Sequence, residues 1–136
     1  MTVTRFTRGL DELSTRVLLD GRHRRVLGVA GTLNYYTAER LTEAYHTLRE
    51  REGRGLRRLV LDLRRVEAFD ATGAAALLEL ARDADSRAFD FLIADRPDRP
   101  AYIATGLRER LRFLAETEIE ELPMHGGFPV PTGKES

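Results

Sequence analysis

Leu59-Val60-Leu61-Asp62-Leu63, followed shortly by Phe69-Asp70-Ala71-Thr72-Gly73-Ala74, is the part of the chain that decides the fold. The first run is typical of a strand buried on both faces. The second leads into an apolar helix, and Asp70 or Thr72 can accept hydrogen bonds from the free N–H groups of its first turn. Gly73 allows the backbone to come close to a neighbour. On composition alone, such a turn is more often a simple helix cap than a binding site, since Asp and Thr are common caps.

Strands and helices alternate on both sides of this junction. The apolar patterns predict strands over residues 15–19, 26–29, 59–63 and 89–94. Helices are predicted over residues 37–51 and 74–84, and over a stretch from about 98 that breaks near 106 and precedes a weaker strand and helical turn in 111–122. The alternation predicts an α/β fold: a mixed β-sheet of four to five strands packed against three to four helices.

The length of 136 residues fits one domain. We expect an N-terminal segment over 1–13, the domain over 14–122, and a flexible tail over 123–136, which is rich in Pro and Gly. No apolar run approaches the roughly 18 residues of a membrane span, and the first residues lack the apolar stretch of a secretion signal. These features predict a soluble, cytoplasmic protein without membrane insertion.

Composition restricts the chemistry available. Lys+Arg 22 equals Asp+Glu 22, so no basic excess favours nucleic acid. Cysteine is absent, which excludes disulfides, thiolate metal sites and cysteine nucleophiles. The histidines, His23, His46 and His125, lack metal-ligand spacing. No nucleophile–base pair is visible either, so we expect no catalytic residue, no metal, no cofactor and no enzymatic activity.

Every basic residue except Lys134 is arginine. The densest basic cluster consists of Arg51, Arg54, Arg57, Arg58, Arg64 and Arg65. Acidic residues are interspersed among them, which favours a solvated surface over a nucleic-acid site. The arginine excess has two explanations, a GC-rich gene or an interface with an acidic partner that uses bidentate pairing. The sequence leaves both open.

Several motifs, taken in order, resemble the STAS domain, the family of bacterial anti-sigma-factor antagonists that is also found attached to sulfate transporters. They are Gly31-Thr32-Leu33-Asn34, the apolar run 59–63, the junction 69–74, and Ala104-Thr105-Gly106-Leu107. The resemblance covers about residues 14–122. It implies a partner-binding regulator: an antagonist binds a serine-kinase anti-sigma factor, which inactivates it by phosphorylating the first hydroxyl residue after the aspartate.

This chain departs from the family pattern at the phosphorylated position. Asp70 and Gly73 match, but that position is Ala71, which has no hydroxyl, and Asn34 stands where an acid is expected. The resemblance therefore implies a protein without the usual switch. Three interpretations remain: a permanently active antagonist, a phosphosite shifted to Thr72, or another interaction. We rank the shifted site second, because we expect Thr72 to cap the helix.

The partner-binding surface implied by this comparison consists of Asn34, Tyr35, Tyr36, Asp70, Ala71, Thr72 and Gly73. The two tyrosines are credible anchors because aromatic side chains dominate interface hot spots, although one of them packing under the first helix is the simpler alternative. The expected partner is a protein, an anti-sigma factor or serine kinase. A scaffold or accessory subunit of a signalling or transporter complex is the alternative, and a homodimer is left open.

Overall fold

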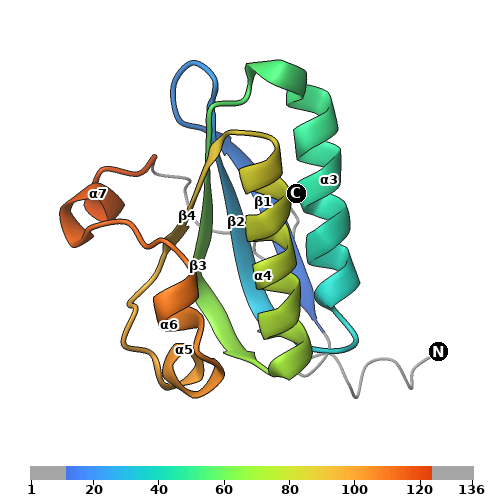
Figure 1. The fold of residues 1–136 in the computed structure, drawn as a ribbon, viewed down its shortest axis with the longest axis vertical. Coiled ribbons are helices and arrows are strands. Elements are labelled where there is room, and N and C mark those ends of the chain that lie inside the picture. Colours follow the sequence, from blue (N-terminus) through green and yellow to red (C-terminus); the bar gives the residue numbers. More distant parts are fainter. Residues whose placement is uncertain (1–11, 124–136) are drawn as a thin grey trace.

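A computed structural model describes residues 12–123, which form a four-stranded mixed sheet in the order β1-β2-β3-β4 (Figure 1). The strands are β1 (Leu13–Leu19), β2 (Arg24–Leu33), β3 (Arg58–Phe69) and β4 (Asp90–Ala94). β1 and β2 form an antiparallel hairpin, and the β2–β3 and β3–β4 pairs are parallel. The predicted α/β class and mixed sheet are confirmed.

Two long helices cover one face of this sheet, and shorter helices occupy its β4 side (Figure 1). The helices are α3 (Ala38–Glu52), α4 (Ala71–Ser86), α5 (Pro100–Thr105), α6 (Leu107–Arg110) and α7 (Glu116–Glu120), with a 3₁₀ turn at Gly53–Gly55. Gly106 adopts the left-handed conformation, with φ 76°, and separates α5 from α6. The break predicted near this glycine is therefore confirmed, and it divides the predicted third helix into two.

The main core lies between the sheet and the α3–α4 layer. Alternate residues of the central strands point into it, among them Leu27, Leu59 and Leu61, and all three are fully buried. Tyr45 of α3 is also fully buried there. A smaller cluster on the opposite face joins Val26, Val60, Ala94 and Leu114, with Ile119 of α7 packed against it.

β3 extends beyond the predicted end at Leu63, through a stretch that contains the charged residues Arg64, Arg65 and Glu67, to Phe69. It stays paired with β2 across register shifts between Gly28 and Ala30 and again before Thr32. Backbone pairing rather than apolar side chains therefore defines this half of the strand. The consequence is that β2 and β3 end side by side, with Leu33 opposite Phe69.

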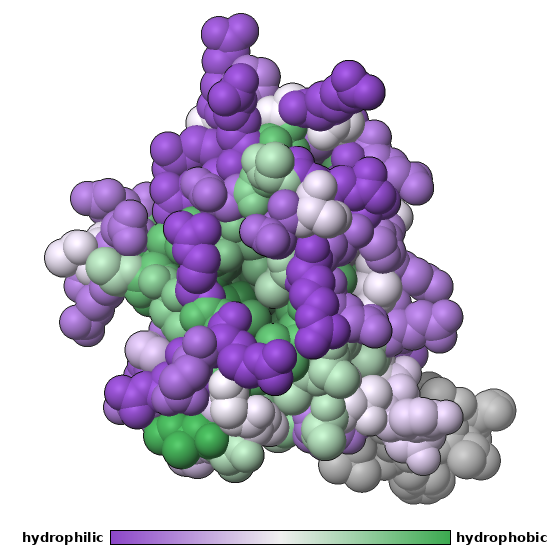
Figure 2. Space-filling view, viewed as in Figure 1, coloured by the Kyte–Doolittle hydropathy of each residue, from purple (hydrophilic) through white to green (hydrophobic). Residues whose placement is uncertain are grey.

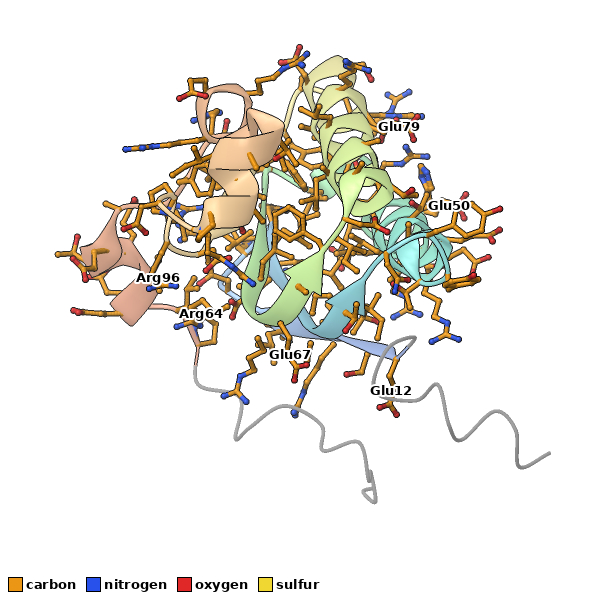
Figure 3. All side chains as sticks on the ribbon, turned by 90° about the horizontal axis from the view of Figure 1, so that it is seen from below. Glu12, Glu50, Arg64, Glu67, Glu79 and Arg96 are labelled. Carbon is orange, nitrogen blue, oxygen red and sulfur yellow. The ribbon has the colours of Figure 1, made fainter. Side chains whose placement is uncertain are left out.

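An ion pair between a buried aspartate and an exposed arginine lies on the sheet face opposite α3 and α4. The Asp62 side chain is 4% exposed and accepts hydrogen bonds from the Arg64 guanidinium at 2.9 and 2.8 Å. That pairing raises the pKa of Arg64 above its ordinary value. Figure 3 shows Arg64 beside Arg96 on the α7 side, whereas Glu50 and Glu79 project from the helical layer. Arg64 is thus separated from the other arginines of the predicted basic cluster that lie around the end of α3.

Two expectations concern features outside this architecture. The predicted N-terminal segment and tail lie outside the described residues, except for residues 12–13 and Pro123. Among residues 12–123, no helix has the length and apolar character needed to cross a membrane, and no three His, Asp or Glu side chains are grouped as metal ligands.

Candidate partner-binding site

The predicted site residues come together because two parallel strands end at the same edge. The segment after β2 carries Asn34, Tyr35 and Tyr36, and the segment after β3 begins with Asp70. The Asp70 N–H donates to the Leu33 carbonyl at 3.2 Å, which continues the strand pairing by one residue. We refer to residues 34–36 and 70–73 as the Asp70 site.

Asp70 fixes the geometry of this site through both carboxylate oxygens. Oδ1 accepts from the Gly73 N–H at 3.0 Å, and Oδ2 accepts from the Tyr35 N–H at 3.3 Å. Asp70 is therefore the N-cap of α4, which begins at Ala71. The expectation that Thr72 caps this helix is wrong. Asp70, with its extended backbone, occupies the cap position, and Thr72 lies exposed in the first turn.

Gly73 is buried under the start of α4 and contacts the end of β2. A Cβ atom added here would lie 2.6 Å from the Leu33 carbonyl oxygen and 2.9 Å from the Leu33 Cγ. Any larger residue would push the helix away from the sheet. Gly73 therefore contributes close packing beneath the surface rather than a contact group on it.

The Asn34 side chain stabilises the turn that follows β2. Its Oδ1 accepts from the backbone N–H groups of Tyr36 at 2.9 Å and Thr37 at 3.2 Å, forming a side-chain-closed turn. The buried Thr37 hydroxyl donates to the Thr32 carbonyl at 2.7 Å and accepts from the Asn34 N–H at 2.9 Å. This network holds the backbone that carries the tyrosines.

Tyr35 and Tyr36 lie on the surface rather than under α3. They are 72% and 69% exposed, and their ring centroids are 5.3 Å apart in an edge-to-face arrangement. Ala71 and Thr72 are exposed as well. The site thus presents an aromatic pair beside the first turn of a helix, on a backbone fixed by hydrogen bonds. Such a surface suits contact with another macromolecule, and none of its groups forms a nucleophile–base pair.

Sequence reasoning missed a buried network that supports the end of β3. Arg99 pairs with Asp95 at 2.6 Å, and it donates to the Leu63 carbonyl at 3.2 Å and to the Val66 carbonyl. The Tyr102 hydroxyl donates to the same Asp95 carboxylate at 2.5 Å. Burial, and then this hydrogen bond, raises the pKa of Tyr102.

The Arg99 guanidinium also lies 5.9 Å from the ring centroid of Phe69, the residue before Asp70. The one sequence signal for this network is the spacing of Asp95 and Arg99, because an aspartate and an arginine four residues apart can form an ion pair.

Comparisons with known proteins find the same fold in other chains. Residues 19–108 match a family model described as "Mlab, STAS domain". No curated protein sequence gives a significant match. Among solved structures, an anti-sigma factor antagonist from Mycobacterium paratuberculosis is 23% identical with a TM-score of 0.66, and the match covers 82% of this chain and 93% of that one.

Two further structures share the fold. The anti-sigma factor antagonist SpoIIAA in its unphosphorylated form is 15% identical with a TM-score of 0.60, covering 79% of this chain and 93% of that one. The murine anion transporter Slc26a9 is 15% identical with a TM-score of 0.60, covering 77% of this chain and 19% of that one. The family match spans most of the described residues, including both segments of the Asp70 site. The chain therefore belongs to the STAS domain family.

Proposed function

We propose that this chain is a non-enzymatic regulator of the anti-sigma-factor antagonist type, which binds a serine-kinase anti-sigma factor through the Asp70 site. The observation that carries the proposal is the exposed Tyr35–Tyr36 pair beside the first turn of α4, with Asp70 hydrogen-bonded to both segments. Exposed aromatic side chains on a fixed backbone lose little conformational freedom on binding and bury large areas.

We also propose that the usual phosphorylation switch does not operate in this chain. The exposed residue directly after Asp70 is Ala71, whose methyl group cannot accept a phosphate. The alternative acceptor, Thr72, is exposed, and its hydroxyl has no side-chain hydrogen bond within residues 12–123. It is thus not engaged as a cap. We expect no phosphate on Thr72 after incubation with the kinase and ATP, because a kinase aligned on the preceding residue misses it. If mass spectrometry instead finds one phosphate per chain on Thr72, the proposal is wrong, and the phosphorylation switch operates at Thr72 in place of position 71.

Binding is tested with purified serine-kinase anti-sigma factors from the same genome. We expect Asp70→Lys and Thr72→Glu to abolish capture of the kinase while circular dichroism stays native. The matched control is Glu79→Lys, an exposed charge change on the same helix (Figure 3). Thr72→Glu is the more informative variant, since a carboxylate at a helix N-terminus does not destabilise the fold. Undiminished binding by both variants would show that the partner uses another surface.

A scaffold or accessory subunit of a signalling or transporter complex is the second candidate. The absence of a hydroxyl at Ala71 favours it, because such a role needs no kinase-controlled release. Light scattering coupled to size-exclusion chromatography separates the candidates. A large homo-assembly supports the scaffold, and a monomer or dimer supports the antagonist.

A further inference from the structure

Two adjoining hollows border the C-terminal half of α4, and together we call them the α4–α6 groove. The smaller, of about 330 Å³, is lined by both apolar and charged residues, and its apolar residues include Leu78, Ala81 and Leu111. The larger, of about 840 Å³, continues past Phe89 toward the C-terminal ends of α3 and α4. Phe89 lines both hollows. Figure 2 shows the hydrophobic surface between α4 and α6 and the long hydrophilic side chains that project on either side of it.

The border of this groove is strongly basic. Seven arginines and three acidic residues line the two hollows, in a chain whose formal charge is zero. Within residues 12–123, four of these arginines have no salt-bridge partner: Arg54, Arg57, Arg82 and Arg110. Among the described residues, the one ion pair of Arg112 is with the exposed Asp90, at 3.6 Å. The groove therefore combines an apolar floor with guanidinium groups that are available to a ligand.

We propose that the α4–α6 groove binds an acidic, amphipathic segment of a protein partner. Apolar side chains of that segment would cover Leu78 and Ala81, which are only half-buried in the free chain. Its carboxylates would pair with Arg82 and Arg110. Arginine suits this role because its planar fork binds a carboxylate through two hydrogen bonds and is weakly hydrated. The arginine-rich composition of the chain would then have a structural use at this surface.

The apolar residues of the groove favour a peptide over nucleic acid, because the basic charge alone would suit either ligand. Single-stranded nucleic acids need exposed aromatic faces on which bases stack. The aromatic residues of this groove, Phe89 and Phe91, are 7% and 6% exposed and belong to the core. The apolar floor instead offers area for the side chains of a polypeptide.

The groove lies along the C-terminal half of α4, whereas the Asp70 site lies at its N-terminus. The inference therefore does not depend on the proposed function, and a variant of one surface leaves the other intact.

Fluorescence anisotropy with a labelled synthetic peptide tests the proposal. The probe is a 12-residue peptide in which glutamates alternate with leucine and phenylalanine, and the two control peptides replace glutamate by lysine or the apolar residues by serine. We expect the acidic amphipathic peptide to bind, with an affinity that falls as salt rises, and both controls to bind at least about tenfold more weakly. The paired change Arg82→Glu with Arg110→Glu should weaken binding by a similar factor, because two attractions become repulsions.

The matched control is Arg22→Glu with Arg108→Glu, which makes the same change in net charge at exposed arginines outside both hollows. Leu78→Ala tests the contribution of the apolar lining residues and should weaken peptide binding while the circular dichroism spectrum stays native. Asp70→Lys should leave peptide binding unchanged, which separates this result from the proposed function. No binding, equal binding of the serine-containing peptide, or equal loss in the control variant would overturn the proposal. If a 12-nucleotide oligothymidylate binds more tightly than the acidic amphipathic peptide, the groove is a nucleic-acid site and the proposal is wrong.

Discussion

Asp70 accepts a hydrogen bond from the backbone N–H of Tyr35 at 3.3 Å, although the two residues are 35 positions apart. Its other carboxylate oxygen caps α4 at Gly73. One side chain therefore connects the segment that carries the tyrosines to the helix that carries Ala71 and Thr72. Changes at Asp70 should disturb the order of both segments, whether or not a partner is present.

Removing the Asp70 carboxylate should release both segments together. We expect Asp70→Ala to lower the free energy of unfolding by about 1 kcal/mol, since it removes the helix cap. It should also accelerate hydrogen exchange at the Tyr35 and Gly73 amides. Asp70→Asn retains an oxygen for the cap and should lose about half as much stability. Urea denaturation and amide exchange by NMR measure the two effects. Unchanged exchange at Tyr35 would show that the Asp70 contact does not order the tyrosine segment.

Gly73→Ala should be far more destabilising than its small added volume suggests. The new methyl group would lie 2.6 Å from a backbone oxygen, that of Leu33, which cannot rotate away. We expect a loss of about 2 kcal/mol or more in the free energy of unfolding, measured by urea denaturation. Gly55→Ala is the control, because its Cβ would meet only the movable His23 side chain, at 3.3 Å. A loss at Gly73 no larger than that at Gly55 would contradict the close packing of α4 on β2.

The sequence predicted the features of this edge that depend on local chemistry. A side-chain cap at the start of α4, close backbone approach at Gly73, and two neighbouring strands that each lead into a helix all follow from residue type and strand–helix order. The choice between Asp70 and Thr72 as the cap did not follow, because either side chain can accept the same hydrogen bonds. The geometry decided it by starting α4 at Ala71.

Features that depend on long-range pairing escaped prediction. The second half of β3 carries the charged residues Arg64, Arg65 and Glu67, so periodicity gives no strand signal there. Its conformation comes from pairing with β2. The Arg99 network escaped for a related reason, since its acceptors include the backbone carbonyls of Leu63 and Val66, which no side-chain pattern reveals.

The tyrosine pair allows binding to be separated from stability. Tyr35→Ala and Tyr36→Ala should change the free energy of unfolding by less than about 0.5 kcal/mol, because both side chains are mainly exposed. The double variant should weaken kinase binding by at least about tenfold if the pair is an interface anchor. Isothermal titration calorimetry measures the affinity, and Ile103→Ala is the control, as another exposed hydrophobic residue, 53% exposed, on α5. Full affinity in the double variant would remove the aromatic pair from the interface.

Asp83 should make stability depend on pH in the acid range. Its Oδ2 accepts from the buried Tyr45 hydroxyl at 2.7 Å and from Arg49 at 2.5 Å. Burial alone would raise the pKa of Asp83, but these hydrogen bonds outweigh it and hold that pKa below the ordinary value of 3.8. The unfolded chain therefore binds this proton first as the pH falls. The stabilisation is complete above the ordinary value and is lost as the pH falls through the folded-state value.

Asp83→Asn should accordingly lower the free energy of unfolding at pH 7 by about 1 to 2 kcal/mol, because an amide oxygen replaces a charged acceptor. When the pH is lowered from about 5 to about 3, the difference from the unaltered chain should begin to shrink near the ordinary pKa of 3.8 and should go on shrinking below it. Urea denaturation over this range measures it. Asp85→Asn is the control, an exposed carboxylate on the same helix with no salt bridge within residues 12–123, and it should shift stability little at either pH. A constant difference between Asp83→Asn and the unaltered chain would mean that the contact stabilises the fold without any lowering of the Asp83 pKa.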